Sequence, residues 1–244
     1  MTTLSRRIAP KAVLLENVPG FASSKFSAYR QELLKSLHSL GFEAGYKVLQ
    51  AANYGVSQLR PRFVLVALRK EYASYFRWPE HCSAPPTVGE LLYDLMVERG
   101  WPGADSWRSR ANGIAPTLVG GSKKHGGPDL GPTRAKAQWR ELGVDGLGIA
   151  DLPPEPIFPI DGNPRLTTRM AARIQGFPDS WVFHGKKTAS YRQIGNAFPP
   201  PVARAVGKSI VAALRRLNQK PTAELFSTVL IAEPTGDYKI TKKE

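Results

Sequence analysis

The spacing of apolar residues predicts three strands and one helix in the first third of the chain. Residues 11–15 (KAVLL) form a brief apolar run that ends at a turn signal, as in a buried strand of a parallel sheet. Residues 42–50 (FEAGYKVLQ) and 62–68 (RFVLVAL) predict two further strands, the second with an almost continuous apolar run. Between the first and second strands, residues 24–41 predict an amphipathic helix. These elements together predict a partial α/β layer.

The expected helix over residues 24–41 carries terminal signals at both ends. Ser24 is the expected N-cap, and Gly41 is the expected stop. We expect its apolar face to pack on the sheet. That face consists of Phe26, Tyr29, Leu33, Leu37 and Leu40.

The character of the chain changes at about Trp78, after which prolines and glycines dominate through Pro164. This stretch contains a short helical patch at residues 88–96 and basic, glycine-rich loops, and it predicts a separate small domain. Helical sequence returns at residues 166–177 and again at residues 199–217. In the last helix one apolar stripe is expected to be core packing: Val202, Val206, Ile210, Leu214 and Leu217.

The expected domain organisation follows from these changes. The first 78 residues belong to a larger α/β domain, residues 79–164 form the small domain, and residues 165–219 return as helices that complete the larger domain. Residues 220–244 form a tail to which the sequence assigns no role.

The net positive charge of the chain indicates the class of its binding partner. The formal net charge is +14 and the isoelectric point is about 10.0, so a polyanionic partner is expected. Because no apolar segment is long enough for a bilayer, nucleic acid is favoured over a membrane. A basic surface that serves only solubility is the alternative. With 42% hydrophobic residues, the 244-residue chain can bury a real core.

Cysteine and histidine usage narrows the chemistry. The single cysteine, Cys82, excludes a disulfide framework and a multi-cysteine zinc site, which fits a reducing cytoplasm. The four histidines show no metal-ligand spacing, so no metal is expected. The first residues lack the apolar core of a signal peptide. We therefore expect a cytoplasmic protein, associated with the nucleoid if it binds DNA.

Glu16 stands out because it follows the first apolar run and precedes a Pro-Gly turn. In open α/β sheets, ligands bind at the carboxyl ends of the strands, so a carboxylate at this point is a site candidate. A surface glutamate that opens a loop is the other interpretation, and these residues alone favour it.

Four ordered segments carry a family resemblance. They are PKAVLLENVPG (10–20), AANYGVSQLRPRFVLVALR (51–69), RLTTRMAARIQGFPDSW (165–181) and YRQIGNAFPPPVARAVGKSI (191–210). In this order they resemble the carboxyl-terminal half of the DNA cytosine-5-methyltransferase family over residues 8 to 217. The resemblance implies an α/β fold: a partial Rossmann-like S-adenosylmethionine-dependent methyltransferase domain with an inserted small target-recognition domain.

The resemblance also implies a reaction: sequence-directed methyl transfer from S-adenosylmethionine to carbon 5 of cytosine in duplex DNA. In this family a cysteine thiolate adds to carbon 6, and an acid hydrogen-bonded at N3 relieves the charge that builds on the ring. Glu16 is similar in context to that acid. Gln58, Arg60 and Arg62 match a QxRxR motif, which assigns Arg62 to the ring oxygen and Arg60 to orientation or phosphate. A surface ion pair beside the strand is the alternative for the arginines.

The target base must leave the duplex, so a cationic cleft is expected. The expected DNA-binding residues are Gln58, Thr117, Lys123, Lys124, Arg134 and Arg165, with Lys136 and Arg140 in the same basic cluster. Arg165 and Arg169 resemble family positions that stabilise the recognition region, and Met170 stands where the family usually has glutamate. Asn196 resembles the asparagine near the methionine end of S-adenosylmethionine, although a Gly-Asn turn before a helix is ordinary structure.

Two family signatures do not occur in the sequence: the glycine-containing cofactor loop and the Pro-Cys dipeptide that holds the nucleophile. Cys82 follows the second matched segment, so it is not expected to be that nucleophile. The resemblance therefore implies half of an enzyme, with a second polypeptide that carries the missing parts, or the product of a truncated gene. A DNA-binding remnant without activity and an RNA cytosine methyltransferase are the alternatives.

Overall fold

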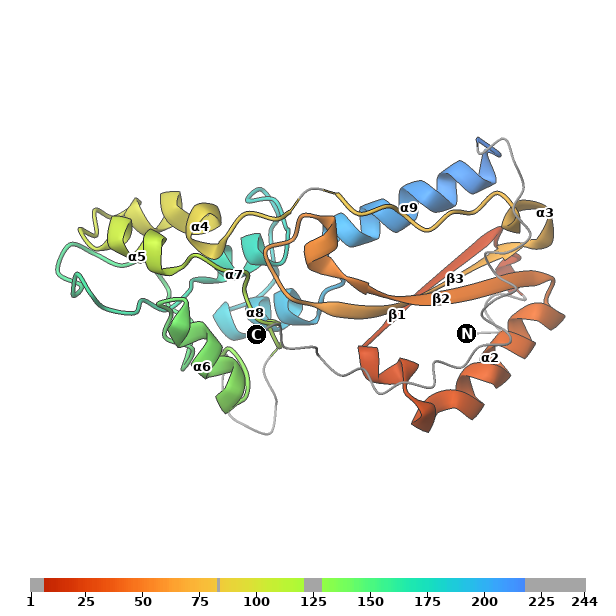
Figure 1. The fold of residues 1–244 in the computed structure, drawn as a ribbon, viewed down its shortest axis with the longest axis horizontal. Coiled ribbons are helices and arrows are strands. Elements are labelled where there is room, and N and C mark those ends of the chain that lie inside the picture. Colours follow the sequence, from red (N-terminus) through yellow and green to blue (C-terminus); the bar gives the residue numbers. More distant parts are fainter. Residues whose placement is uncertain (1–6, 83, 121–128, 218–244) are drawn as a thin grey trace, which may run out of the picture. The chain divides into compact units, whose positions relative to one another are not determined.

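The computed structural model describes residues 7–82, 84–120 and 129–217 and divides them into two compact units. Unit 1 contains a small sheet with its helices, and unit 2 contains a helical cluster with long loops (Figure 1). The described residues of unit 1 are 7–48, 63–78 and 208–217, and those of unit 2 are 49–62, 79–82, 84–120 and 129–207.

The sheet has the strand order β1-β3-β2, with β1 at Ala12–Asn17, β2 at Phe42–Gln50 and β3 at Pro61–Arg69 (Figure 1). The three predicted strands are therefore confirmed. The predicted parallel pairing of the first strand is wrong, because β1 runs antiparallel to β3. An apolar run reports burial and not direction, and the burial of β1 is only partial, with Leu14 38% exposed.

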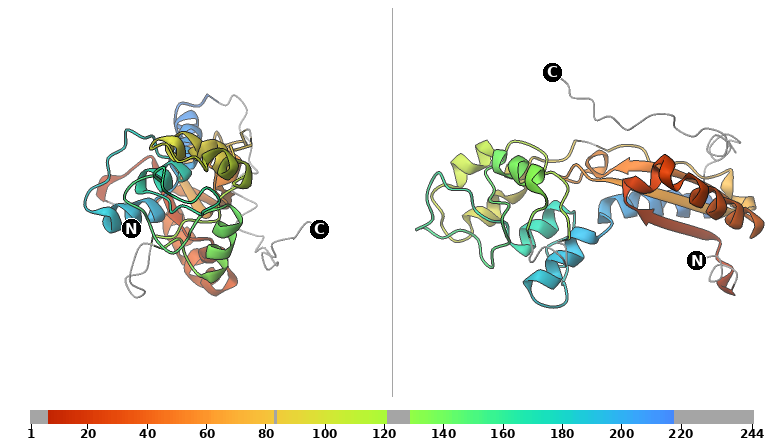
Figure 2. Two further views of the ribbon diagram at one scale, coloured as in Figure 1. Left: turned by 90° about the vertical axis from the view of Figure 1, so that its left-hand side faces the viewer. Right: turned by 90° about the horizontal axis from the view of Figure 1, so that it is seen from below.

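β3 forms the centre of the sheet, and its residues from Phe63 to Leu68 are buried on both faces. Alternate residues Phe63, Leu65 and Ala67 pack against Leu34 and Leu37 of the helix α2. The carboxyl-terminal part of helix α9 (Pro200–Leu214) lies on the opposite face of this sheet (Figures 1 and 2). Coverage on both faces explains why the strand reads as a continuous apolar run.

The expected first helix exists, but it begins later, and its expected apolar face is confirmed only in part. A 3-10 turn, η2 (Ser24–Phe26), precedes α2 (Ser27–Ser39), so Ser24 is not the N-cap. Gly41 follows the helix with a φ of +82°, a conformation that favours glycine, as the expected stop requires.

The buried residues of α2 are Arg30, Leu34 and Leu37, whereas Tyr29 is 65% exposed. Leu33, Leu37 and Leu40 belong to the core of the sheet or pack against it, as expected. Arg30 also turns inward and donates from Nη1 to the carbonyl oxygens of Phe21 and Ser23, each at 2.6 Å. A buried arginine that binds loop carbonyls is invisible to a count of apolar positions.

Unit 2 is built from five helices around one core among the residues that the structure describes. They are α4 (Val88–Val97), α5 (Ala104–Arg110), α6 (Thr133–Glu141), α7 (Thr168–Ile174) and α8 (Lys187–Asn196). The helical patches predicted at residues 88–96 and 166–177 are confirmed as α4 and α7. Trp107 and Trp139 are fully buried at the centre of this core.

The helix α4 has a complete capping box. The hydroxyl of Thr87 accepts from the backbone N–H of Glu90, and the Glu90 carboxylate accepts from the backbone N–H of Thr87. Next to the cap, α4 and α5 approach closely, since a Cβ at Gly89 would lie 2.3 Å from the carbonyl oxygen of Arg108. Glycine is therefore required at this helix crossing.

The two units differ from the expected domains in two respects, the first being that residues 49–62, expected in the larger domain, belong to unit 2. Unit 2 resumes at residue 79, as expected, but it retains residues 165–207 instead of returning them to the sheet. Ile174 of α7 and Tyr191 of α8 lie in the same core as the tryptophans of α5 and α6, which explains the difference. The expected tail, residues 220–244, lies outside the described residues.

The stripe predicted for the last helix is confirmed at its start. Val202 and Val206 are buried, at 1% and 0% exposure. Leu217 is 63% exposed and lies beyond the end of α9, so the stripe ends earlier than expected. Within the described ranges, no helix is long and apolar enough to cross a membrane.

Candidate functional site

The QxRxR segment leads into β3, and the three residues that define the motif are buried. Gln58 and Arg60 are 0% exposed, and Arg62 is 9% exposed. The Gln58 side chain accepts from the backbone N–H of Leu118 at 2.9 Å and donates from Nε2 to Oε1 of Gln175 at 2.6 Å. Gln58 was expected to bind DNA, but its side chain presents no surface in this structure.

Arg60 binds backbone carbonyl groups from two distant segments of unit 2. Nη1 donates to the carbonyl oxygen of Leu118 at 2.5 Å, and Nη2 donates to those of Gly195 at 2.6 Å and Ala197 at 3.1 Å. Of the two roles expected for Arg60, orientation or phosphate binding, a fully buried guanidinium fits only orientation.

Gln175 completes the group and was not among the expected site residues. It is fully buried, and its Nε2 donates to the carbonyl oxygen of Ala197 at 2.7 Å. The only sequence signal was an uncharged amide between the apolar neighbours of the third matched segment. We call Gln58, Arg60 and Gln175 the amide cluster.

Thr117 belongs to a short stretch that pairs with the QxRxR segment. The backbone N–H of Leu59 donates to the carbonyl oxygen of Ala115 at 2.8 Å, and that of Ala115 donates to the carbonyl oxygen of Ser57 at 3.1 Å. The Thr117 hydroxyl donates to the carbonyl oxygen of Leu59 at 2.6 Å. Thr117 is half-buried, and its expected contact with DNA stays a prediction.

Asn196 is exposed at the end of α8, beside a crossing of two backbones. A Cβ at Gly120 would lie 2.4 Å from Oδ1 of Asn196, and a Cβ at Gly195 would lie 2.5 Å from the Cα of Gly120. The approach at Gly195 is to backbone and therefore requires glycine, whereas the approach at Gly120 is to the tip of a side chain. The expected cofactor contact and the expected recognition segment thus lie against each other within unit 2.

The expected catalytic residues Glu16 and Arg62 are carried by different units. Glu16 is exposed in β1 of unit 1, where it stands opposite Val64 of β3. Arg62 belongs to unit 2, and its Nη1 donates to the carbonyl oxygen of Pro61 at 2.9 Å. Their expected roles in catalysis stay predictions.

Part of the expected basic cluster lines a pocket of about 340 Å³ beside α6. Lys136 forms an ion pair with Asp129 at 2.7 Å. Arg140 and Arg134 are exposed on the same helix. Lys123 and Lys124 lie outside the described residues. Pocket-lining residues are Lys136, Arg140, Val144, Asp145, Gly146, Leu147 and Asn163.

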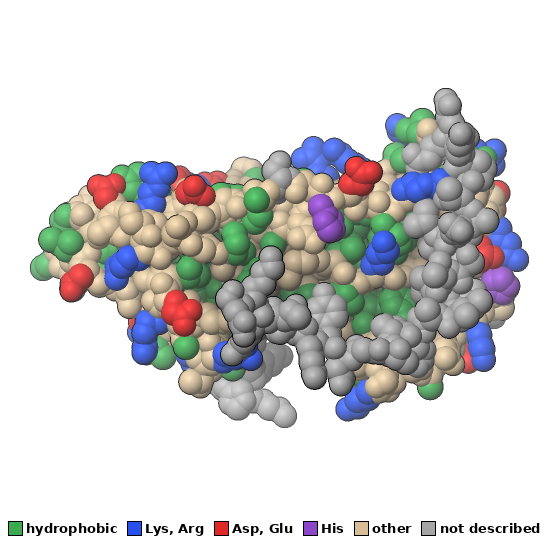
Figure 3. All heavy atoms as spheres, in the orientation of Figure 1, with side chains coloured by type: hydrophobic (Ala, Val, Ile, Leu, Met, Phe, Trp, Pro, Cys, Tyr) green, Lys and Arg blue, Asp and Glu red, His purple; other side chains and the backbone are tan. Residues whose placement is uncertain are grey.

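Arg165 reaches this pocket through an ion pair in which its Nε donates to Asp145 at 2.8 Å. Partial burial acts to raise the pKa of Asp145, but the hydrogen bonds from Arg165 and from the backbone of Leu147 outweigh it and hold the pKa below its usual value. On the face shown in Figure 3, Lys and Arg side chains also lie in separate groups, and several of them lie beside Asp or Glu.

Two further arginines bind carboxylates on α4 and on the loop after α7. Arg169 contacts Glu98 and Asp179, and Arg173 contacts Asp94 and Asp179. These bonds fit the structural role expected for Arg169.

At Met170 the thioether sulfur takes the place of the family's usual carboxylate. It accepts from the backbone N–H of Thr167 at 3.4 Å, while the Thr167 hydroxyl accepts from the N–H of Met170 at 3.2 Å. The residue is fully buried. The helix start is thus capped without the ion pair that a glutamate would allow.

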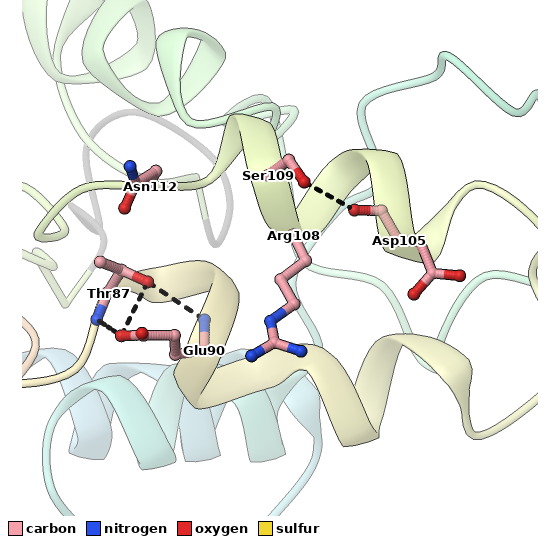
Figure 4. Close-up of a pocket in the computed structure, with 6 residues that line it drawn as sticks. All are labelled: Thr87, Glu90, Asp105, Arg108, Ser109 and Asn112. Carbon is pink, nitrogen blue, oxygen red and sulfur yellow. Dashed lines mark hydrogen bonds between the residues drawn. The ribbon is translucent and has the colours of Figure 1, made fainter.

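A second pocket, of about 510 Å³, lies between α4 and α5 (Figure 4). Its charged side chains already have partners: Glu90 closes the helix cap, and Asp105 accepts from the hydroxyl of Tyr93 at 2.6 Å. Arg108 lies over the ring of Tyr93, 5.0 Å from its centroid. We therefore assign this pocket no functional role.

Cys82 is exposed in the stretch of unit 2 that precedes α4. Its backbone N–H donates to the carbonyl oxygen of Asn53 at 2.9 Å. In the part of the chain that the structure describes, no group of three His, Cys, Asp or Glu side chains could hold a metal ion.

Comparison with known proteins identifies the family. Residues 2–212 match the family model described as C-5 cytosine-specific DNA methylase, and the chain belongs to this family. It is 59% identical over 206 residues to the Type II methyltransferase M.NaeI of Lentzea aerocolonigenes, covering 84% of this chain and 50% of the relative. It is 50% identical over 218 residues to M.NgoMIV of Neisseria gonorrhoeae, covering 88% of this chain and 69% of that relative.

Solved structures show the same fold at low sequence identity. A protein described as a DNA modification methyltransferase from an Escherichia coli prophage matches with a TM-score of 0.54 and 22% identity, covering 88% of this chain and 72% of that chain. A variant of Spodoptera frugiperda DNMT2 matches with a TM-score of 0.54 and 16% identity, covering 82% and 66%. The α/β class is thus confirmed. The chain spans about half the length of M.NaeI.

Proposed function

We propose that this chain supplies part of a DNA cytosine-5-methyltransferase of a restriction-modification system, acting on duplex DNA in a sequence-directed way. The observation that carries the proposal is the 59% identity to M.NaeI, which extends over 84% of the chain. At that identity, the segments that carry the expected site residues lie within a closely similar sequence. The basic composition, with a net charge of +14, supports a polyanionic substrate.

Glu16 and Arg62 carry the chemistry that this chain contributes. The Glu16 carboxyl group hydrogen-bonds ring N3 and the exocyclic amine, and it shares a proton with N3 as a thiolate adds to carbon 6. Arg62 donates to the ring oxygen, for which a group of constant positive charge is suited. Both residues act on the base after it has left the duplex.

S-adenosylmethionine is the proposed methyl donor, and it supplies the electrophilic methyl group that carbon 5 attacks. Asn196 is the residue of this chain that fits its methionine end, because the carboxamide is exposed and both neighbouring glycines restrict its position. The proposal includes no metal, since the family's reaction uses a thiol nucleophile and a carboxylic acid.

Of the residues expected to bind DNA, the exposed ones are proposed to contact it. Arg134 and Arg140 on α6, together with Arg165, suit phosphate contacts, whereas Thr117 lies shortly before the basic, glycine-rich sequence at residues 120–127. Gln58 and Arg60 are buried, so we propose that they hold the recognition segment instead of touching DNA.

A second polypeptide is proposed because the sequence contains no Pro-Cys dipeptide and no glycine-containing cofactor loop. Among the described residues, the sheet has an edge at which a second polypeptide could add a strand. β1 is an edge strand with β3 on one side, and apolar side chains remain exposed along and just after it, Leu14 at 38% and Val18 at 57%. An unpaired edge of this kind is a template for another strand. A DNA-binding remnant without activity is the second candidate, which the same missing dipeptide favours.

The test is reconstitution. The purified chain is mixed with an amino-terminal fragment of M.NaeI that contains its Pro-Cys dipeptide, and transfer of a labelled methyl group to duplex DNA is measured. We expect activity from the mixture and none from either part alone. Activity of this chain alone contradicts the two-part proposal, and a mixture that binds DNA without methyl transfer supports the remnant. RNA in place of DNA should accept no methyl groups.

A further inference from the structure

The amide cluster forms an ordered relay of hydrogen bonds between two loops of unit 2. The relay starts at the carbonyl oxygen of Ala197, which accepts from Nε2 of Gln175 at 2.7 Å. Oε1 of Gln175 then accepts from Nε2 of Gln58 at 2.6 Å, and Oε1 of Gln58 accepts from the backbone N–H of Leu118 at 2.9 Å.

The direction of each amide in this relay is fixed by its neighbour. Because Gln175 uses its NH₂ group on Ala197, only its oxygen is available to Gln58. Gln58 must then turn its own oxygen toward Leu118. A buried polar network that is fully bonded in this way specifies one arrangement of the segments it joins.

Arg60 reinforces the same two loops from the side. Its guanidinium holds the carbonyl oxygen of Leu118 on one loop and those of Gly195 and Ala197 on the other. The two accepting groups on the second loop flank Asn196 on both sides. The peptide groups before and after Leu118 are thus both held by side chains of the amide cluster.

The two loops are those to which the proposed function assigns different ligands. Thr117 and Gly120, on either side of Leu118, belong to the segment proposed to read DNA, and Asn196 belongs to the turn proposed to bind the cofactor. Gly120 also contacts Gly195 so closely that no side chain fits between them. A shift of one loop therefore requires a shift of the other.

We infer that Gln175 is a positioning residue for DNA sequence selection. It touches neither ligand, but it fixes the orientation of Gln58 and through it the recognition segment at Leu118. This inference rests on the proposed function, because it assigns a selectivity role to a residue of the same enzyme.

A first measurement tests the relay directly in the isolated full chain. Gln175→Met keeps the length of the side chain and removes both hydrogen bonds. We expect the Leu118 amide to exchange with deuterium about tenfold faster, the factor that the loss of about one hydrogen bond produces. The matched control is Gln193→Met on α8, where Nε2 of an exposed glutamine donates to the carbonyl oxygen of His184 at 2.6 Å. The control should leave Leu118 exchange unchanged.

A second measurement tests selection, with the reconstituted complex and a library of duplexes of random sequence. Gln175→Met should methylate a broader set of sequences than the unmodified protein, whereas Gln193→Met should methylate the same set. The dependence of DNA affinity on salt should stay the same in all three, because the relay makes no phosphate contact.

A third variant separates positioning from simple damage to the fold. Gln175→Glu keeps the acceptor for Gln58 but places a carboxylate against the carbonyl oxygen of Ala197. Burial raises the pKa of such a carboxyl group, whereas the Arg60 guanidinium, which donates to the same carbonyl oxygen of Ala197 at 3.1 Å, lowers it. The protonated form of the carboxyl group regains a donor. We therefore expect the fast exchange at Leu118 to return toward the unmodified rate as the pH is lowered, which a general loss of structure would not produce.

Two results overturn the inference: unchanged exchange at Leu118 in Gln175→Met, or faster exchange with an unchanged set of methylated sequences. Failure of the proposed function is seen elsewhere, in an unmodified complex that methylates no DNA. The exchange measurement on the isolated chain does not depend on that activity.

Discussion

β3 in unit 1 and the amide cluster in unit 2 are both fully buried, but they are buried for different reasons. The β3 residues from Phe63 to Leu68 are apolar and exclude water from both faces of a sheet. The amide cluster places a guanidinium and two carboxamides in the interior, where each must find a partner. Apolar burial stabilises the sheet without demanding direction, whereas polar burial holds particular atoms at particular distances.

The largest loss of stability is expected when the buried guanidinium of Arg60 is removed. Arg60→Met removes the donor to the carbonyl oxygens of Leu118 and Gly195, whereas that of Ala197 keeps its bond from Gln175. Because each buried acceptor left unsatisfied costs about 1–3 kcal/mol, the free energy of unfolding should fall by about 2–6 kcal/mol. Urea denaturation followed by tryptophan fluorescence measures it. Arg134→Met, on the exposed face of α6, should change stability by less than about 0.5 kcal/mol. Equal effects at both positions would show that the bonds of Arg60 contribute nothing.

Truncation of the apolar interior should cost nearly as much but by another route. Leu65→Ala in β3 leaves a cavity and should destabilise the protein by about 2–5 kcal/mol. Leu14→Ala in β1, where the side chain is 38% exposed, should cost clearly less. Unlike the Gln175 variants, Leu65→Ala should leave exchange at Leu118 unchanged apart from global unfolding. A local change there would mean that the two interiors are not independent.

A smaller effect is expected from the glycine crossing that adjoins the amide cluster. Gly195→Ala introduces a Cβ 2.5 Å from the backbone of Gly120, and the strain should cost about 1–3 kcal/mol. Gly207→Ala is the control, since no atom lies within 4 Å of its Cβ and alanine favours the helix by about 1 kcal/mol. Thermal unfolding should move in opposite directions for the two variants. A stabilised Gly195→Ala variant would contradict the close approach of the two loops.

The smallest effect concerns ion pairs that are partly exposed. The hydrogen bond from Arg173 is the main cause that holds the pKa of Asp179 below its ordinary value. The carboxylate therefore stabilises the fold fully above the ordinary pKa, and this contribution is lost as the pH falls through the lowered one. Asp179→Asn should flatten the acid side of a stability-against-pH curve, whereas the exposed Asp161→Asn should not. Solvent screening keeps the size of this effect small. Parallel curves for all three proteins would remove Asp179 from the acid response.

The contrast between the two interiors also explains what the sequence could predict. The strands at residues 42–50 and 62–68 and the helices at 88–96 and 166–177 follow from apolar spacing, which reports burial directly. The antiparallel direction of β1 does not follow from it, because pairing partners lie about fifty residues away in the chain. Arg30, like the residues of the amide cluster, is a buried polar side chain, and a count of apolar positions does not detect such residues.

The family motif identified polar residues of the site, but the sequence did not predict which of them are buried. Gln58 was expected to bind DNA as part of the QxRxR motif, yet it is fully buried here, although glutamine is mostly exposed in proteins. Gln175 was missed because a single amide in a helical segment carries no periodic signal. The hydrogen bond between Gln175 and Gln58 joins residues 117 positions apart, so only the folded chain brings them together.

The most direct test of the proposed function compares Glu16→Gln with Cys82→Ser in the reconstituted enzyme, by single-turnover methyl transfer and DNA affinity. Glutamine keeps the size of the side chain but cannot share a proton with ring N3, so the rate should fall by about a hundredfold to ten-thousandfold with little change in affinity. Cys82→Ser should leave both quantities nearly unchanged, because that thiol lies in the exposed stretch before α4. An intact rate in Glu16→Gln together with loss of methylation in Cys82→Ser would place the nucleophile in this chain and contradict the proposal.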